Sequence, residues 1–114
     1  MSNTVSIQKM KKRDGRIVEF DPQRIAIAAG KALKAAGMGS DKVARHIADD
    51  VVRELVDKGY DDELQIPDVE VIQDLVEHAF VKRGLSQAAK LYILYRASHT
   101  KIREAKKLMM DVQE

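Results

Sequence analysis

The sequence predicts a small α+β domain, mostly α, in which a β-cap packs on a four-helix bundle. Residues 5–20 read as a hairpin around Asp14-Gly15, a dipeptide that favours a tight turn between strands. From Asp21 onwards, apolar residues recur three and four positions apart, and glycines separate the segments. This pattern is typical of amphipathic helices with left-handed C-caps. A chain of 114 residues suits one domain with its own core.

The N-terminal hairpin, residues 5–20, is expected to turn at Asp14-Gly15 in a type I′ conformation. Its second half ends in Ile-Val-Glu-Phe, and such β-branched and aromatic residues suit a strand. A hairpin alone is only marginally stable in water, so it must pack on another element. A short strand near residues 63–66, just before Pro67, is expected to complete a three-stranded cap.

Two helices follow the hairpin. Asp21 is placed to cap the first, with Pro22 at its first position, and Ser40-Asp41 begin the second. They are expected to end at Gly37-Met38 and Gly59-Tyr60, since glycine followed by an apolar residue is the Schellman pattern. The side chains expected to be buried are Ile25, Ala28, Ala29, Ala32, Leu33 and Ala36, then Val43, Ile47, Val51, Leu55 and Val56.

A third helix is expected from Pro67 to Gly84-Leu85, and a fourth is expected to be capped by Ser86. Residues expected to be buried are Val69, Ile72, Val76, Ala79 and Phe80, then Leu91, Leu94, Tyr95 and Ile102 towards Leu108. The final stretch, KIREAKKLMMDVQE, is still helical and charged where the sequence stops. We interpret residues 1–114 as one domain taken from a longer protein. The alternative is a native C-terminal helix that frays into solvent.

Composition argues against several chemistries. Cysteine is absent, which removes disulfides, thiolate metal sites and cysteine nucleophiles and fits a cytoplasmic location. His46, His78 and His99 are not at metal-ligand spacing, and no serine lies in a nucleophile elbow. No apolar run reaches the roughly 18 residues of a membrane span. We therefore expect no catalytic residue, no metal site and no membrane partner.

The basic residues around the turn suggest an anion site. Lys12 and Arg13 precede the turn, and Arg24 lies one turn into the first helix, at the end whose free N–H groups favour anions. A hairpin folded back onto that helix would bring the three cations together. The arginine fork and the lysine point charge suit a polyphosphate. The alternative is a solvated positive edge that discourages aggregation between strands.

Three stretches, in this order and spacing, resemble the ATP-cone domain over about residues 7–106: KKRDGRIVEFDPQRI, IPDVEVIQDLVEHAF and AKLYILYRASHTKIRE. The resemblance implies a three-stranded cap over a four-helix bundle. It also implies a regulatory domain that binds ATP or dATP, with magnesium accompanying the triphosphate. ATP cones are typical of the N-terminus of ribonucleotide reductases, which they switch by changing oligomeric state. The expected partners are therefore the nucleotide, the catalytic part of a reductase and further copies of the chain.

The resemblance further implies which residues contact the nucleotide. Lys12 and Arg13 match the pair that holds phosphates, and Arg24 matches a further basic ligand. The other matched positions line the base, sugar or helix entry: Met10, Asp21, Ile25, Val69, Gln73 and Leu94. The chain departs from the family twice. Val18 stands where a carboxylate for the ribose is common, and Ser98 stands where a cation is common.

Other functions remain open at the level of sequence. A nucleic-acid-binding helical module of a transcriptional regulator is permitted by the pI of about 8.9. It is also permitted by the basic residues of the last helix: Lys90, Arg96, Lys101, Arg103, Lys106 and Lys107. A net charge of only +2 and few aromatic residues argue against it. The remaining alternatives are a cone attached to another enzyme such as a kinase, and an oligomerisation domain without a ligand.

Overall fold

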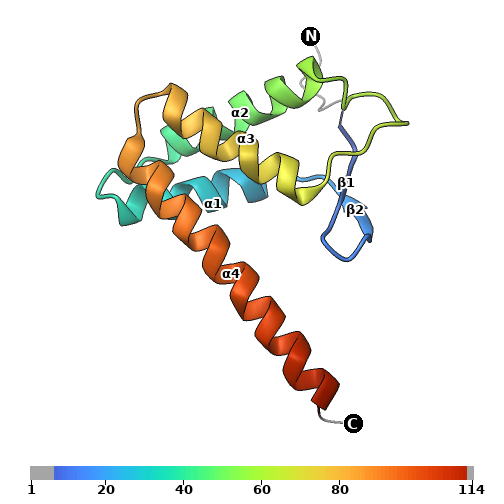
Figure 1. Ribbon diagram of the computed structural model, residues 1–114. Coiled ribbons are helices and arrows are strands. Elements are labelled where there is room, and N and C mark those ends of the chain that lie inside the picture. Colours follow the sequence, from blue (N-terminus) through green and yellow to red (C-terminus); the bar gives the residue numbers. More distant parts are fainter. Residues whose placement is uncertain (1–6, 113–114) are drawn as a thin grey trace.

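The computed structural model describes residues 7–112, with the side chains of residues 103, 107 and 109–112 left out. Four helices and a two-stranded antiparallel sheet make up this part of the chain, and the hairpin lies beside the N-terminal ends of α1 and α3 (Figure 1). The elements in order are β1 (Lys9–Lys11), β2 (Ile17–Glu19), α1 (Pro22–Ala35), α2 (Asp41–Asp57), α3 (Val69–Lys82) and α4 (Ser86–Val112). None of the helices described has both the length and the apolar composition needed to cross a bilayer.

The hairpin turn is one residue longer than predicted. The Lys12 amide donates to the Arg16 carbonyl at 2.8 Å, and the Gly15 amide donates to the Lys12 carbonyl at 2.9 Å. Gly15 has φ +89°, whereas no other kind of residue in the described chain has a positive φ. A type I′ turn needs two such residues, so the loop is instead residues 13–15, ending in a left-handed glycine. The predicted start of the hairpin, at residues 5 and 6, lies outside the described residues.

The predicted third strand at residues 63–66 is absent from the structure as described. An isolated parallel bridge, Lys11 with Asp68, joins this region to the hairpin, and the Lys11 amide donates to the Pro67 carbonyl at 2.9 Å. Pro67 has no amide hydrogen with which to extend a ladder. The Leu64 amide is already bonded to Asp62 Oδ1 at 2.9 Å in a local turn. The cap therefore has two strands and one bridge.

The first two helices begin as predicted, each with a side chain that accepts a hydrogen bond from a free backbone amide. The Gln23 amide donates to Asp21 Oδ1 at 3.0 Å, and the Val43 amide donates to Ser40 Oγ at 3.2 Å. Both capping residues have an extended backbone, as an N-cap requires. The start of α1 is therefore fixed immediately after the hairpin.

The last two helices begin at residues other than those predicted. Helix α3 starts at Val69 and not at Pro67, because Asp68 takes the N-cap position and accepts the Val71 amide at 2.9 Å. Helix α4 starts at Ser86 itself, so Ser86 is not a residue that precedes and caps it.

Three helices end in the predicted Schellman motif. The glycines at 37, 59 and 84 have φ between +73° and +89°. In each motif the amide after the glycine bonds back across the last turn: Met38 to the Leu33 carbonyl at 2.8 Å, Tyr60 to Leu55 at 3.0 Å and Leu85 to Phe80 at 2.9 Å. The helix boundaries at these ends were thus predicted correctly.

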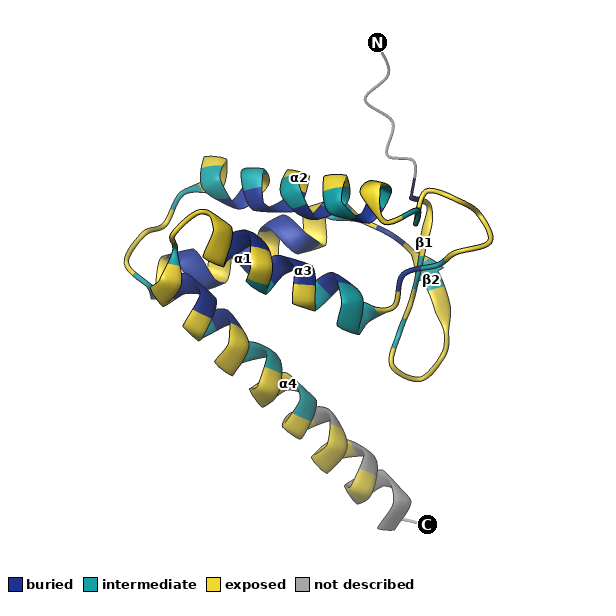
Figure 2. Cartoon of the chain, turned by 45° about the horizontal axis from the view of Figure 1, so that its top comes forward, coloured by how far each residue is buried: buried dark blue, intermediate teal, exposed yellow. Residues whose placement is uncertain are grey.

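The core lies between α1, α2, α3 and the first turns of α4 (Figure 2). Its largest fully buried side chains include Phe80, Leu33, Ile47, Leu55, Val51 and Val76, in agreement with the helical periodicity of the sequence. The prediction fails along α4, which buries Ala88, Ala89 and Tyr92, whereas Leu94, Ile102 and Leu108 are 63%, 49% and 66% exposed. Helix α4 has 27 residues, while α1 and α3 have 14 each. It extends beyond the helices that it packs on.

An ion pair joins α2 to the end of α3. Arg83 donates to both carboxylate oxygens of Asp50, from Nε at 2.6 Å and from Nη2 at 3.0 Å. The hydrogen bond from Arg83 holds the pKa of Asp50 below its usual value. Arg53, one turn along α2, also reaches Asp50 at 3.3 Å, but its side chain is 67% exposed. The Arg83 pair is therefore the stronger link.

We expect Asp50→Asn to lower the free energy of unfolding by about 1 kcal/mol at pH 7, because the charge-assisted pair is lost. Since the pKa of Asp50 is depressed on folding, its contribution is fully present above the unfolded pKa of about 3.9. It is lost as the pH falls through the folded pKa. Urea unfolding of both proteins should thus differ at pH 7 and converge in acid. Arg53→Ala, the control, should cost less than about 0.5 kcal/mol, and equal stabilities at pH 7 would contradict the assignment.

Candidate functional site

A cleft of about 440 Å³ lies between the hairpin, α1 and α3, with Tyr92 of α4 also in its wall. Most of the predicted site residues line it: Met10, Lys12, Asp21, Arg24, Ile25, Val69 and Gln73. Arg13 and Leu94 are not among its lining residues. Val18, at the position that departs from the family pattern, also lines it, whereas Ser98 is exposed on α4.

The strand alternation explains which hairpin residues face the cleft. Met10 pairs with Val18, and the Lys12 amide bonds to the Arg16 carbonyl. These four residues lie on one face, because side chains on a strand alternate with a period of two. Arg13 begins the loop and leaves that face. The hairpin arginine that lines the cleft is therefore Arg16, which the sequence analysis did not select.

Three cations, Lys12, Arg16 and Arg24, line the cleft together with two carboxylates, Glu19 and Asp21. Within residues 7–112, neither Lys12 nor Arg24 forms an ion pair, while Arg16 Nε lies 2.8 Å from Asp14 Oδ2. The Arg16 amide, at 3.1 Å, holds the pKa of Asp14 below its usual value. Like charges facing each other across a hairpin destabilise it. Lys12 and Arg24, near the N-terminus of α1, therefore form a place where an anion is favoured.

Part of the lining of the cleft is apolar. Ile25, Ile72 and Val76 are buried, Met10 and Val69 are half-buried, and all five line the cleft. Burial also raises the pKa of the Tyr92 hydroxyl, which makes ionisation of this group still less favourable. Small-molecule sites of about 300–1,000 Å³ commonly combine an apolar wall with a few polar groups. The lining residues suit a ligand with a flat apolar part and an anionic part.

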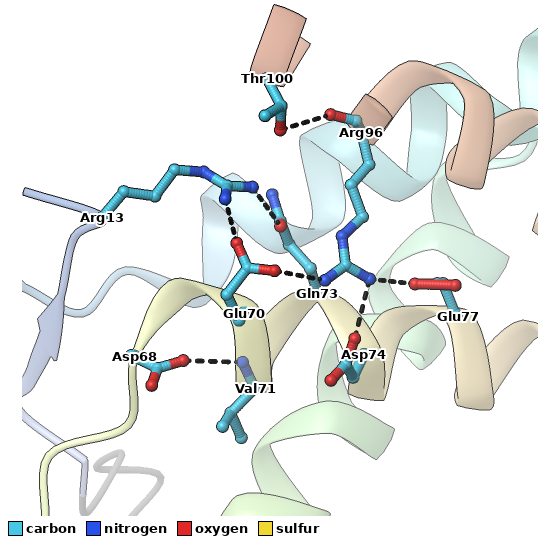
Figure 3. Close-up of polar contacts among 9 residues, drawn as sticks. All are labelled: Arg13, Asp68, Glu70, Val71, Gln73, Asp74, Glu77, Arg96 and Thr100. Carbon is cyan, nitrogen blue, oxygen red and sulfur yellow. Dashed lines mark hydrogen bonds and ion pairs between the residues drawn. The ribbon is translucent and has the colours of Figure 1, made fainter. Parts of the chain in front are cut away.

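Arg13 has its own partners at the rim of the cleft (Figure 3). It forms an ion pair with Glu70, at the start of α3, and its Nη2 donates to Gln73 Oε1 at 3.3 Å. Glu70 Oε1 also accepts from Arg96 Nη2 of α4 at 2.9 Å. One carboxylate is therefore shared by the hairpin loop and the last helix.

Arg96 is the centre of an acidic cluster on α3. Besides Glu70, it pairs with Asp74 at 2.9 Å and with Glu77, and its side chain is only 16% exposed. Burial alone would lower the pKa of Arg96, but the hydrogen bonds to Asp74 and Glu70 raise it above its usual value. The sequence signal for this cluster is the 70, 74, 77 spacing, which places the three carboxylates along one side of a helix. Arg96 is thus engaged within the domain and is not part of an open basic surface.

Four other hollows among residues 7–112 are lined by none of the predicted phosphate ligands Lys12, Arg13 and Arg24. A hollow of about 530 Å³ between α1 and the start of α2 is lined by the basic residues Lys31, Lys34 and Arg45. No group of three or more His, Cys, Asp or Glu side chains that could hold a metal ion is found among the residues described. The cleft beside the hairpin remains the site where the predicted residues converge.

The chain belongs to the ATP cone domain family, because the model of that family matches residues 8–101, which include every lining residue of the cleft. An allosteric, nucleotide-binding role follows from this membership. A vitamin B12-dependent ribonucleoside-diphosphate reductase of Thermoplasma acidophilum is 39% identical over 108 residues, which cover 90% of this chain and 13% of that protein.

Two further relatives are reductases as well. A vitamin B12-dependent ribonucleoside-diphosphate reductase of Mycobacterium tuberculosis is 33% identical, over 89% of this chain and 14% of its own length. A ribonucleoside-diphosphate reductase subunit alpha of Chlamydia muridarum is also 33% identical, over 82% of this chain and 10% of its own length. The chain thus spans a small part of these relatives, the part that corresponds to the ATP cone.

We expect Arg96→Gln to lower the free energy of unfolding by about 2 kcal/mol, because three carboxylates lose the largely buried guanidinium that they share. Urea unfolding at pH 7 would measure the change. Arg13→Gln is a matched control, since it removes an arginine from the same Glu70 at a more exposed position. It should cost less than about 1 kcal/mol. Similar losses in the two variants would contradict the central place given to Arg96.

Proposed function

We propose that the cleft binds ATP or dATP as an allosteric effector. The observation that carries the proposal is the convergence of two unpaired cations, Lys12 and Arg24, with an apolar wall in one cleft. The triphosphate would lie against these cations and the N-terminus of α1. The base and sugar would lie against Met10, Ile25 and Val69. Arg16 is added to the predicted ligands, and Leu94 is left out because it does not line the cleft.

Discrimination between ATP and dATP would depend on a single hydroxyl group. A hydrogen bond to that hydroxyl contributes about 1 kcal/mol, and a ligand shifts a conformational equilibrium only by its difference in affinity for the two states. Val18 cannot supply such a bond, whereas Glu19 and Asp21 also line the cleft. Carboxylate oxygens are also suitable ligands for magnesium that arrives with the triphosphate. We propose that one of these two carboxylates contacts the ribose or the metal.

The proposed target of this regulation is the catalytic region of a ribonucleotide reductase. The support is the set of relatives, all of them reductases of which the matched part is 10% to 14% of the length. The nucleotide would act by changing the surface that the domain offers to the catalytic region or to a second copy of the chain.

Removing the two unpaired cations should weaken nucleotide binding strongly. We expect Lys12→Ala with Arg24→Ala to reduce the affinity for ATP and dATP about 100-fold, since each charge-assisted bond contributes about 1.5 kcal/mol or more. Calorimetry of the 114-residue chain with magnesium present would measure this, and circular dichroism would check the helices. Lys31→Ala with Lys34→Ala removes the same charge from α1 at the other hollow and should change affinity little. Unchanged affinity in the first double variant would refute the site.

The oligomeric state should depend on which nucleotide is bound. Sedimentation velocity of the chain with saturating ATP, with saturating dATP and without nucleotide should give different distributions of mass. The physical reason is that a ligand that prefers one association state shifts the equilibrium towards it. Identical distributions in all three conditions would contradict regulation through assembly of this domain while leaving nucleotide binding intact.

A further inference from the structure

Glu70 stands between the proposed nucleotide site and the last helix. It pairs with Arg13 of the hairpin loop on one side and with Arg96 of α4 on the other (Figure 3). Arg13 also bonds to Gln73, and Gln73 lines the cleft. Arg13 therefore lies at the rim of the cleft, and its charge is paired with Glu70, a carboxylate that does not line the cleft.

Building on the proposed function, we propose that Glu70 is a positioning residue that holds Arg13 out of the cleft when no ligand is bound. A triphosphate in the cleft then replaces Glu70 as the partner of Arg13. Glu70 thus lowers the affinity of the site for polyanions and connects the occupancy of the cleft to α4.

The two ion pairs of Glu70 differ in how easily they break. The side chains of Arg13 and Glu70 are 32% and 47% exposed, and Glu70 Oε2, the oxygen that faces Arg13, is buried but accepts no hydrogen bond from the described residues. An ion pair between side chains this exposed, without a hydrogen bond, contributes little to stability. The bond from Arg13 to Gln73, at 3.3 Å, has a neutral acceptor. A triphosphate offers several charges and suits the fork of an arginine better than one shared carboxylate does. Arg13 is therefore the partner that can move.

Arg96 is the partner that stays. Its side chain is 16% exposed, and Asp74 and Glu77 hold it in addition to Glu70. When Arg13 leaves, Glu70 is shared no longer and interacts with Arg96 alone. The bound ligand thus strengthens the ion pair between Glu70 of α3 and Arg96 of α4. By thermodynamic reciprocity, any change that strengthens this ion pair also favours ligand binding.

A double-mutant cycle separates this role from a general effect of charge. Titration with ATP and, as a probe of the phosphates alone, with inorganic tripolyphosphate would compare wild type, Glu70→Gln, Arg13→Ala and the double variant. We expect Glu70→Gln to tighten binding of both ligands by about two- to fivefold. In the Arg13→Ala background, Glu70→Gln should raise the affinity for either ligand no more than a control substitution raises it in wild type. The control is Glu77→Gln, which removes an equal charge from α3 at a residue that contacts Arg96 and not Arg13.

Hydrogen exchange tests the connection to α4. ATP should slow amide exchange around Arg96 and Thr100 in wild type, and this added protection should be lost in Glu70→Gln. Equal ATP affinity of wild type and Glu70→Gln, or a Glu70→Gln effect that persists without Arg13, would overturn the inference alone. Equal protection of α4 in the two proteins would overturn the coupling. If neither wild type nor Glu70→Gln binds ATP, the proposed function is overturned, and the inference falls with it.

Discussion

The register of the β-hairpin is the constraint on which the candidate site depends. A loop of residues 13–15, closed by left-handed Gly15, pairs Met10 with Val18 and sets Lys12 opposite Arg16. A shorter loop would shift the pairing by one residue and turn these side chains to the other face. With the observed register, Lys12 and Arg16 line the same cleft as Arg24 of α1, and within residues 7–112 neither Lys12 nor Arg24 forms an ion pair. The fold thus holds together charges that an anion would stabilise.

Helix α3 separates two electrostatic environments. One side of it, with Ile72 and Val76, closes the cleft and the core. The other side carries the carboxylates that bind Arg96 of α4 and, through Glu70, Arg13 of the hairpin loop. Cations line the cleft on one side of α3, and carboxylates neutralise Arg13 and Arg96 on the other. Glu70, which pairs with both arginines, connects the two sides. Such a connection suits a regulatory domain better than a rigid scaffold.

Local signals predicted most of the fold. Capping residues and the three glycine stops act within a few residues, so Asp21, Ser40 and the helix ends could be read from the sequence. Some failures were of local detail: the length of the hairpin turn, the third strand and the starts of α3 and α4. The others depend on contacts between distant segments, which decide the exposure of the distal half of α4 and the position of Arg13. The predicted site residues, three chosen for their charge and the others by resemblance, line one cleft, except Arg13 and Leu94. Arg13 could not be placed because its partners lie some 60 residues away in the chain.

The length of α4 has a mechanical consequence. It is one uninterrupted helix from Ser86 to Val112, held in the core near Tyr92 and clamped at Arg96, and its remainder extends away from the other helices (Figure 1). At 1.5 Å per residue, Leu108 lies roughly 18 Å beyond Arg96. A tilt of about 10° at the clamp would therefore move Leu108 by about 3 Å. Because the distal part of α4 packs on none of the other helices described, a small change in direction at Arg96 would be amplified along its length.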